Sequence, residues 1–473
     1  MAFKDFKANT TRSIVSTTID SVLKYVNKDR QTNLLKLVDI SEKLMGDKFS
    51  KEVFDGARNM ISEPDSKWMI FANTLMDELD PHVLKMHALN LGYQAGFYGY
   101  SKTQELGKKY GHDIPWVILL DPTSACNMHC TGCWAAEYGH KMSLSYEDLD
   151  SIISQGEDLG IYFYPMTGGE PLMRKNDIIK LAEKHNKSIF HIFTNGTLVD
   201  EAFCHELKRV GNVSLSLSVE GFEETNDRRR GSGSFRKVMQ AMDLLKEHGL
   251  FFGTSICYTS QNYETVTSDE FLDMLISHGV RFTWYFHYMP VGNDASTELL
   301  LTPEQRKYMY HRVREIRGMT GGKPIFAIDF QNDGEFVGGC IAGGKYYCHI
   351  NPNGDVEPCV FIHYSDANIH EKTLLECLSQ PLFIAYQKGQ PFNENPLRPC
   401  PMLENPESLQ AIIKTTGSAS TDMQSPESAC HLCGKCTTYA ENWAPIADEL
   451  LRTYSPERKM EKGSLSDEKV KDK

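Results

Sequence analysis

Short apolar runs alternate with amphipathic helical patterns between Trp116 and about residue 320, and this alternation limits the fold more than any other feature. Strand–helix alternation implies a parallel sheet whose strands are joined by crossover helices. We therefore expect an α/β fold, a partial TIM-like barrel of six strands, short of the eight that close a complete barrel. The predicted strands are Val117–Leu120, Ile161–Met166, Ile189–Thr194, Val213–Val219, Phe252–Tyr258 and Thr283–Tyr288.

The segments on either side of this barrel differ from it in pattern. Residues 1–112 carry apolar positions at helical spacing, which predicts a helical N-terminal region before the barrel of residues 113–320. Within this region, the Met- and aromatic-rich stretch 82–100 is predicted to pack on the next domain rather than to form a lipid or substrate surface. A Cys-rich extension over residues 321–454 follows, and the charged tail 455–473 is expected to be disordered.

Composition narrows the class of protein. The formal net charge of −13 argues against a nucleic-acid partner, because phosphate contacts favour a basic face. No run of about eighteen apolar residues occurs and the N-terminus lacks a signal-peptide core, so we expect a cytoplasmic protein without a transmembrane segment. In such a protein clustered cysteines indicate metal ligands, whereas the isolated Cys204, Cys257 and Cys377 are predicted to be small buried side chains.

Three thiols follow the first predicted strand in the run Cys126-x3-Cys130-x2-Cys133. Functional groups of α/β barrels lie on loops at the C-terminal ends of strands, so the position suits a site. A structural zinc site usually takes its ligands from two separated pairs of residues. Three thiolates from one loop leave a coordination position open, which favours an iron–sulfur cluster.

The loop after the second predicted strand reads Gly168-Gly169-Glu170-Pro171. Two glycines allow a ligand to approach the backbone closely, and the adjacent carboxylate can bind an ammonium group. Since this loop lies one strand from the thiol loop, we expect both at the same mouth of the barrel.

These two motifs, in this order, resemble the radical S-adenosylmethionine (SAM) superfamily over roughly residues 115–320. The resemblance implies that Cys126, Cys130 and Cys133 hold a 4Fe–4S cluster whose fourth iron binds the amino and carboxylate groups of SAM. It further implies an enzyme: an electron from a donor such as flavodoxin or ferredoxin cleaves SAM, and the resulting 5′-deoxyadenosyl radical abstracts hydrogen from a substrate. Groups that resemble SAM contacts in this family are Gly168, Gly169, Glu170, Asn195, Ser216, Ser218, Arg230 and the backbone of Tyr288–Gly292.

Two details of this assignment need a structure. Arg230 resembles the residue that pairs with the SAM carboxylate, but Arg228–Arg230 also fits a solvated charge run. Gly132 stands where the family usually has an aromatic residue before the third cysteine. Trp134 is then expected either to shield the cluster or adenine, or simply to cover the mouth.

The pattern Cys340-x13-Gly354-x4-Cys359 resembles the start of a SPASM or twitch extension, in which a hairpin supplies ligands to an auxiliary cluster. The resemblance implies one auxiliary 4Fe–4S cluster held by Cys340 and Cys359, whereas Cys348 is predicted to serve packing. The other ligands are expected among Cys400, Cys430, Cys433 and Cys436, and a zinc site on the same thiols is the alternative.

The substrate is less constrained than the chemistry. Resemblance to SPASM proteins favours peptide or protein maturation, although residues 1–112 lack the strand pattern of the usual peptide-recognition module. A lipid or small-molecule substrate is the alternative. A non-enzymatic redox or scaffold protein would keep the clusters but would have no use for Gly168–Pro171.

Overall fold

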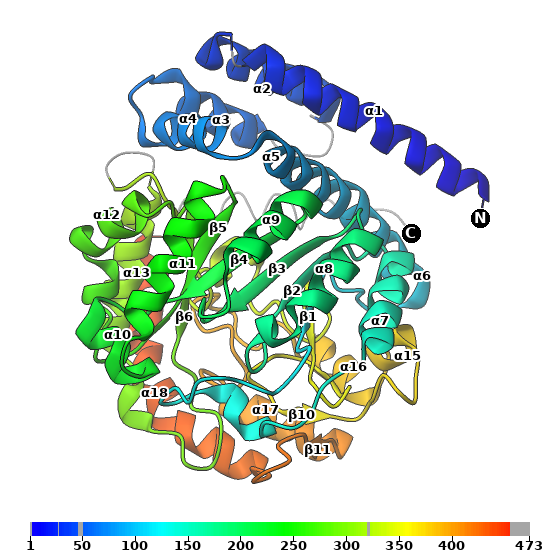
Figure 1. Cartoon of the computed structure of the whole chain (residues 1–473). Helices are drawn as coiled ribbons and strands as arrows, with labels where there is room; N and C mark the ends of the chain where they lie inside the picture. Colours follow the sequence, from blue (N-terminus) through cyan, green and yellow to red (C-terminus); the bar gives the residue numbers. More distant parts are fainter. Residues whose placement is uncertain (1, 27, 46–50, 319–321, 455–473) are drawn as a thin grey trace.

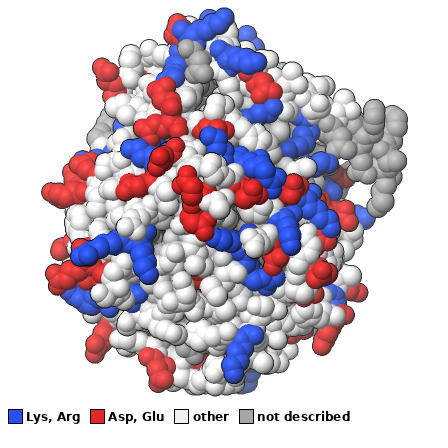
Figure 2. Space-filling view, viewed as in Figure 1, with Lys and Arg blue, Asp and Glu red and all other residues white. Residues whose placement is uncertain are grey.

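The computed structural model describes residues 2–26, 28–45, 51–318 and 322–454, so the predicted tail 455–473 lies outside the described residues. The blue N-terminal helices and the orange C-terminal helices lie at opposite ends of the central sheet (Figure 1). No helix of the described residues is long and apolar enough to cross a bilayer. On the face shown in Figure 2, basic and acidic side chains are interspersed.

One curved sheet forms the centre of the molecule, with strand order β7-β6-β5-β4-β3-β2-β1-β8-β9. Strands β1 to β8 run parallel, and β9 is antiparallel to β8. The strands are β1 Val117–Leu120, β2 Phe163–Met166, β3 Ile189–Thr194, β4 Val213–Ser218, β5 Phe252–Tyr258, β6 Phe282–His287, β7 Phe326–Asp329, β8 Tyr347–Ile350 and β9 Val356–Glu357, with β10 Tyr364–Ser365 and β11 Ala419–Ser420 in a separate pair.

The six predicted strands are confirmed as β1 to β6, but the sheet contains two more parallel strands than expected. β7 adds to β6, and β8 pairs with β1 so that Val117 lies opposite Tyr347. The boundary predicted at residue 320 therefore cuts through this sheet. Both extra strands have only four residues and lie in the Cys- and turn-rich segment, which concealed them. Among the described strands, β7 and β9 remain edges, so the barrel stays open.

Helices cover the outer face of the sheet and bury its apolar side chains, which include Ile118, Tyr164, Ile192 and Leu215. Most begin with a side-chain cap, such as Ser145 at α7, which satisfies free backbone N–H groups. These helices are α7 Tyr146–Leu159, α8 Lys175–Lys184, α9 Glu201–Val210, α10 Glu223–Arg230, α11 Ser234–Glu247, α12 Asp269–Ser277 and α13 Pro303–Arg317.

The N-terminal region is helical, as predicted, and packs against the end of the barrel where the strands begin. Asn90 donates hydrogen bonds to the backbone oxygens of Asn186 and Ser188, and Trp116 donates to the backbone oxygen of Ala95. The stretch 82–100 therefore covers the N-terminal ends of the strands, the end opposite the thiol loop, and packs on the barrel as predicted. The helices are α1 Ala2–Val26, α2 Arg30–Met45, α3 Lys51–Ser62, α4 Lys67–Glu78, α5 Pro81–His87, the π-helix η1 Ala88–Gly99 and α6 Tyr100–Tyr110.

The C-terminal region packs against the opposite end of the barrel and builds a second apolar core around Trp443, Tyr386 and Leu403. Its β8–β9 hairpin turns at Pro352–Asp355, between Cys340 and Cys359, where the resemblance implied a hairpin. The helices are α14 Gly334–Val337, α15 Leu374–Leu378, α16 Pro381–Gly389, α17 Pro406–Thr416 and α18 Ala429–Tyr454; the short 3-10 helices are η2 Trp134–Tyr138, η3 Pro171–Arg174, η4 Thr265–Thr267 and η5 Thr297–Leu299.

Candidate active site and auxiliary cluster site

The carboxyl ends of β1 to β6 surround a cavity of about 190 Å³. Parallel strands bring their following loops to one edge, so residues far apart in the chain meet there. The thiol loop after β1 and the glycine loop after β2 both contribute. The predicted site residues that line the cavity are Cys126, Cys130, Cys133, Gly168, Gly169, Glu170, Asn195, Ser218 and Arg230.

The thiol loop is held at both ends by polar contacts. Asn127 donates to Thr197 at 2.8 Å and accepts from Asn195 at 2.8 Å, which fixes the loop to the end of β3. The Thr131 N–H donates to the backbone oxygen of Arg229 on α10 at 2.9 Å. The loop is therefore positioned by the barrel before any metal binds.

The donor set fits an iron–sulfur cluster. Burial raises the pKa of Cys126 to about 11 and also raises the pKa of Cys133, so these thiols keep their protons at neutral pH without a metal. Metal binding must displace those protons, and nearby cations favour the resulting thiolates. Nη1 of Arg230 lies 4.0 Å from Sγ of Cys130.

The glycine loop lies directly against the thiol loop. The N–H groups of Gly169 and Glu170 donate to the backbone oxygens of Thr123 and Ala125. A Cβ atom on Gly169 would lie 2.2 Å from the Ala125 oxygen, and Gly168 has a φ of 108°. We expected the glycines to admit a ligand; in the structure they also admit the backbone of the neighbouring loop, where no side chain fits.

Glu170 is buried, and its carboxylate holds the end of β3 in place. Oε1 accepts from Thr194 at 2.7 Å and from the Leu172 N–H at 3.0 Å, while Oε2 accepts from the Asn195 N–H at 2.8 Å. Burial raises the pKa of this carboxyl group. Glu170 thus positions Asn195 and the strand end as well as lining the cavity.

Two arginines share one buried acid beside the cluster loop. Nη1 of Arg229 and Nη2 of Arg230 both lie 2.6 Å from Oε1 of Glu220, whose side chain is fully buried. Within this group, two cations face one carboxylate and leave one positive charge in excess, which suits a neighbouring thiolate cluster or a carboxylate ligand. The run Arg228–Arg230 is therefore not simply solvated: Arg228 is exposed, whereas Arg229 and Arg230 line the cavity. The sequence reasoning missed Arg229.

The structure explains why Gly132 stands where the family usually has an aromatic residue. Its φ is 67°, and a Cβ there would lie 2.8 Å from the ring of Tyr288. The Tyr288 ring therefore occupies the space beside the third cysteine. Trp134 also lines the cavity, and its ring meets the rings of His349 and Phe361 edge-on at 6.1 Å.

Two polar residues differ from their predicted places. Ser216 is fully buried and lies 2.9 Å from Nε2 of His191, below the cavity that Ser218 lines, because alternate residues of β4 sit at different depths. Cys257 was expected to be a buried packing residue, but it lines the cavity at the end of β5. Its exposure to the cavity could have been anticipated from its position at a strand end. Cys204 and Cys377 are fully buried, as predicted.

The auxiliary cysteines form two groups. Three of these thiols lie close together: Cys340, Cys359 and Cys400. Burial is the main cause of the raised pKa of Cys400, and the nearby thiols of Cys340 and Cys359 raise it further. Sγ of Cys340 lies 3.3 Å from Oη of Tyr386, and Oη of Tyr347 donates to Sγ of Cys359 at 3.6 Å. Cys348 is packed in the main core on β8.

The run Cys430-x2-Cys433-x2-Cys436 lies on the first turns of helix α18. The same spacing fits successive helical turns. Cys433 and Cys436 are buried, whereas Cys430 is exposed. The Glu404 carboxylate contributes to the raised pKa of both Cys400 and Cys436, so it lies near both groups.

A buried hydrogen-bonded chain connects the two candidate cluster sites. His287 lines the cavity, and its Nε2 lies 3.0 Å from Oη of Tyr439. Arg306 donates to the same Oη at 3.2 Å and pairs with Oε1 of Glu404 at 2.6 Å. Oε2 of Glu404 accepts from the Cys400 N–H at 2.6 Å. The chain thus runs from the cavity to an auxiliary cysteine.

Residues 120–275 match the family model of the radical SAM superfamily, and residues 340–402 match that of the SPASM iron–sulfur cluster-binding domain. The chain thus contains a radical SAM domain and a SPASM domain. These matches confirm the predicted radical SAM and SPASM-like domains, and the predicted cofactors in kind: a radical SAM domain uses a 4Fe–4S cluster with SAM, and a SPASM domain binds auxiliary iron–sulfur clusters.

Characterised proteins with related sequences include Fe-coproporphyrin III synthase of Methanosarcina barkeri, 27% identical over 48% of this chain and 59% of that protein. The match thus spans less than two thirds of that relative's length. Mycofactocin maturase MftC of Mycolicibacterium smegmatis is 28% identical over 56% of this chain and 67% of its own. Among solved structures, Streptococcus suis SuiB bound to S-adenosylmethionine shares the fold, with a TM-score of 0.54 at 19% identity over 70% of this chain and 80% of SuiB.

Proposed function

We propose that this protein is a radical SAM enzyme that removes a hydrogen atom from an unactivated C–H bond of a peptide or protein. The observation that carries the proposal is the convergence of three thiols, the Gly168–Glu170 loop and Arg230 on one cavity. When bound there, the cluster and SAM supply the electron and the 5′-deoxyadenosyl radical for this reaction. A non-enzymatic cluster protein would have no need for the second and third of these features.

The chain's own residues hold and enclose those groups. Cys126, Cys130 and Cys133 supply the thiolates, and the Arg229–Arg230 pair offsets their negative charge. Arg230 also suits a carboxylate ligand, because its guanidinium is planar and permanently charged. The rings of Trp134 and Tyr288 line the cavity and exclude water from a reactive radical.

Two similar proteins support a peptide substrate for this enzyme. One is a maturase, and a structure of SuiB contains its precursor peptide SuiA. The N-terminal region has no strand within residues 2–26, 28–45 and 51–110, so a peptide would be recognised without a β-ribbon there. A porphyrin-like small molecule is the second candidate, favoured by the synthases among the relatives and by the apolar rings of Phe193, Phe286 and Phe361 in the cavity wall.

We assign the auxiliary cluster to Cys340, Cys359 and Cys400. Of the three thiols on α18, Cys436 is the best placed to be the fourth ligand, because Glu404 lies close to both Cys400 and Cys436. When bound by these residues, that cluster would supply an acceptor for an electron released from the substrate. Reduction of the first cluster requires a donor protein, for which a flavodoxin or ferredoxin has the appropriate potential.

The test is formation of 5′-deoxyadenosine. The full chain is reconstituted anaerobically with iron and sulfide, reduced with dithionite and given SAM. We expect 5′-deoxyadenosine from the wild type and from Cys204→Ala, whose thiol lies in the core away from the cavity, and none from Cys126→Ala. Absence of product from a wild type with an intact first cluster would refute the enzyme and leave the redox or scaffold function.

The substrate class is tested by isotope transfer. Extract from source cells grown in deuterated medium is added to the reduced enzyme, and deuterium in 5′-deoxyadenosine is measured by mass spectrometry. Protease treatment of the extract is expected to abolish the transfer. Transfer that survives protease would contradict the peptide substrate and favour the small molecule.

A further inference from the structure

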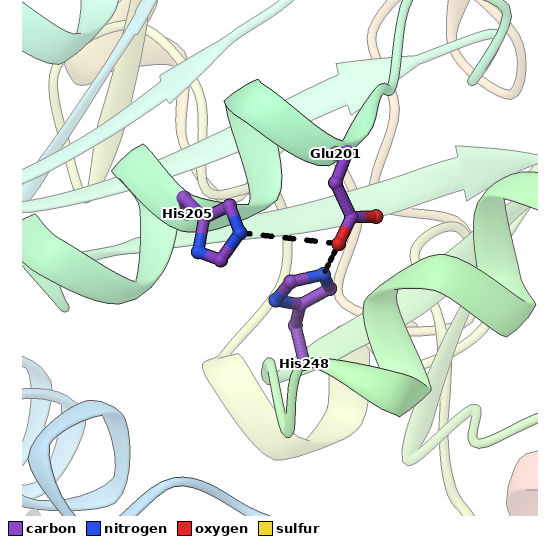
Figure 3. A group of neighbouring side chains, drawn as sticks. All are labelled: Glu201, His205 and His248. Carbon is purple, nitrogen blue, oxygen red and sulfur yellow. Dashed lines mark hydrogen bonds and ion pairs between the residues drawn. The ribbon is translucent and has the colours of Figure 1, made fainter.

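A second group of ligand-type side chains lies on the outer surface of the barrel (Figure 3). Glu201 and His205 are four residues apart in the first turns of helix α9, so they share one face. His248 ends helix α11 and points at them from the neighbouring element. Oε1 of Glu201 lies 2.8 Å from Nε2 of His248 and 3.9 Å from Nε2 of His205.

We propose that Glu201, His205 and His248 form a binding site for a divalent transition-metal ion of the zinc class. One ligand atom from each of the three residues lies within 4.8 Å of the other two. Two imidazoles and one carboxylate are a donor set that zinc uses, with water in the fourth position. The site is independent of the proposed radical chemistry, since none of its residues lines the cavity.

The geometry requires only a small adjustment. Bonds of about 2.0–2.1 Å to a tetrahedral zinc ion place the ligand atoms about 3.3 Å apart. The imidazole of His205 is 67% exposed, so it can rotate towards the other two groups without disturbing the core. His248 is only 11% exposed and provides the fixed ligand.

The local charges are mixed but permit a cation. The C-terminal end of helix α11 at His248 carries partial negative charge that favours a metal ion, whereas the N-terminal end of α9 opposes it. Glu201 compensates at that end with a full negative charge. Each histidine would bind the metal through an unprotonated ring nitrogen, so protons compete with the metal for these ligands.

The site lies where the N-terminal region meets the barrel, which suggests its role. Gly249, next to His248, accepts a hydrogen bond at 2.8 Å from the N–H of Asp80, which also pairs with Lys208 of α9 at 3.0 Å. A metal ion bridging α9 and α11 would fix the two elements on which Asp80 rests. The metal would therefore act as a structural clamp for the N-terminal region.

The test uses untagged, cluster-loaded full-length protein and zinc alone. After equilibrium dialysis, we expect the wild type to hold one more zinc per chain than His205→Gln, with at least a tenfold weaker affinity in the variant. Zinc X-ray absorption should show this additional ion with nitrogen or oxygen neighbours at about 2.0–2.1 Å rather than sulfur at about 2.3 Å. Zinc should also raise the melting temperature of the wild type more than that of His205→Gln.

His278→Gln is the matched control. His278 lies 2.6 Å from Asp243, an exposed histidine–carboxylate pair outside the proposed site, so this variant should bind zinc as the wild type does. Equal zinc content in the wild type and His205→Gln would overturn the proposal. So would an absorption spectrum in which sulfur alone surrounds the zinc, because that ion would sit on cluster cysteines.

Discussion

Oη of Tyr439 lies 3.0 Å from Nε2 of His287, and this contact joins helix α18 to the end of strand β6 beside the candidate active site. Nδ1 of His287 lies 2.6 Å from the backbone oxygen of Tyr288, so this nitrogen carries the proton and Nε2 accepts from Tyr439. Burial lowers the pKa of His287 to about 3, which keeps the ring neutral. Helix α18 therefore holds a cavity residue in one tautomer.

Replacing Tyr439 with Phe removes this hydrogen bond and retains the ring. The buried Nε2 of His287 then lacks its donor, and we expect a loss of about 1–3 kcal/mol in the free energy of unfolding. The melting temperature of the cluster-loaded protein checks this. An unchanged melting temperature would show that the contact does not stabilise the domain junction.

Arg306 and Glu404 form a fully buried ion pair next to Cys400. Removing one partner leaves the other charged and unpaired, so Arg306→Met is expected to destabilise the protein by about 3–5 kcal/mol. The double variant Arg306→Met/Glu404→Gln should recover part of this loss. The exposed pair Arg228–Glu224 is the control, since Arg228→Ala should cost less than about 1 kcal/mol. Additive losses in the double variant would contradict the coupling.

Gly132 is expected to tolerate no side chain. Gly132→Ala places a Cβ against the Tyr288 ring at a positive φ, with a cost of about 1–3 kcal/mol confined to the thiol loop. We predict reduced iron retention by the first cluster and less 5′-deoxyadenosine, with the rest of the fold intact by circular dichroism. Gly56→Ala, where a Cβ meets nothing within 4 Å, should leave both quantities unchanged.

His349 lies buried between Asp121 at 3.1 Å and Glu357 at 2.6 Å. Although burial opposes the charged ring, these carboxylates raise the pKa of His349 to about 10. A raised pKa stabilises the folded state below the unfolded-state pKa of about 6.5, and this contribution is lost as the pH rises towards 10. The melting temperature of the wild type should therefore fall relative to that of His349→Asn between these pH values. A constant difference would contradict a charged His349.

The sequence predicted the parts of this molecule that depend on local patterns. Strands β1 to β6 are apolar runs between amphipathic helices, and both loops of the site follow strand ends, where barrel geometry places function. β7 and β8 were missed because four-residue strands between turns have no periodicity of their own. They are strands only because β6 and β1 offer them a free edge.

The sequence pattern did not reveal which side chains contact one another in the fold. Arg229 and Arg230 line the cavity because both pair with the buried Glu220. Nothing in the run Arg228–Arg230 itself predicts an ion pair with Glu220. Gly132 could be recognised as unusual, but the reason for a glycine there is the ring of Tyr288, which lies in the loop after β6. Likewise, the spacing of Cys430, Cys433 and Cys436 did not reveal that these cysteines lie on the first turns of helix α18.

The most direct measurement is electron–nuclear double resonance on the reduced full-length protein with SAM labelled at the amino nitrogen and carboxylate oxygens. Auxiliary clusters should give no such coupling, so the Cys126→Ala variant serves as the background. The site described here predicts hyperfine coupling from both labelled groups to the cluster of Cys126, Cys130 and Cys133, and weaker carboxylate coupling in Arg230→Met. Absence of any coupling in the wild type, with that cluster intact and reduced, would contradict SAM binding at this cavity.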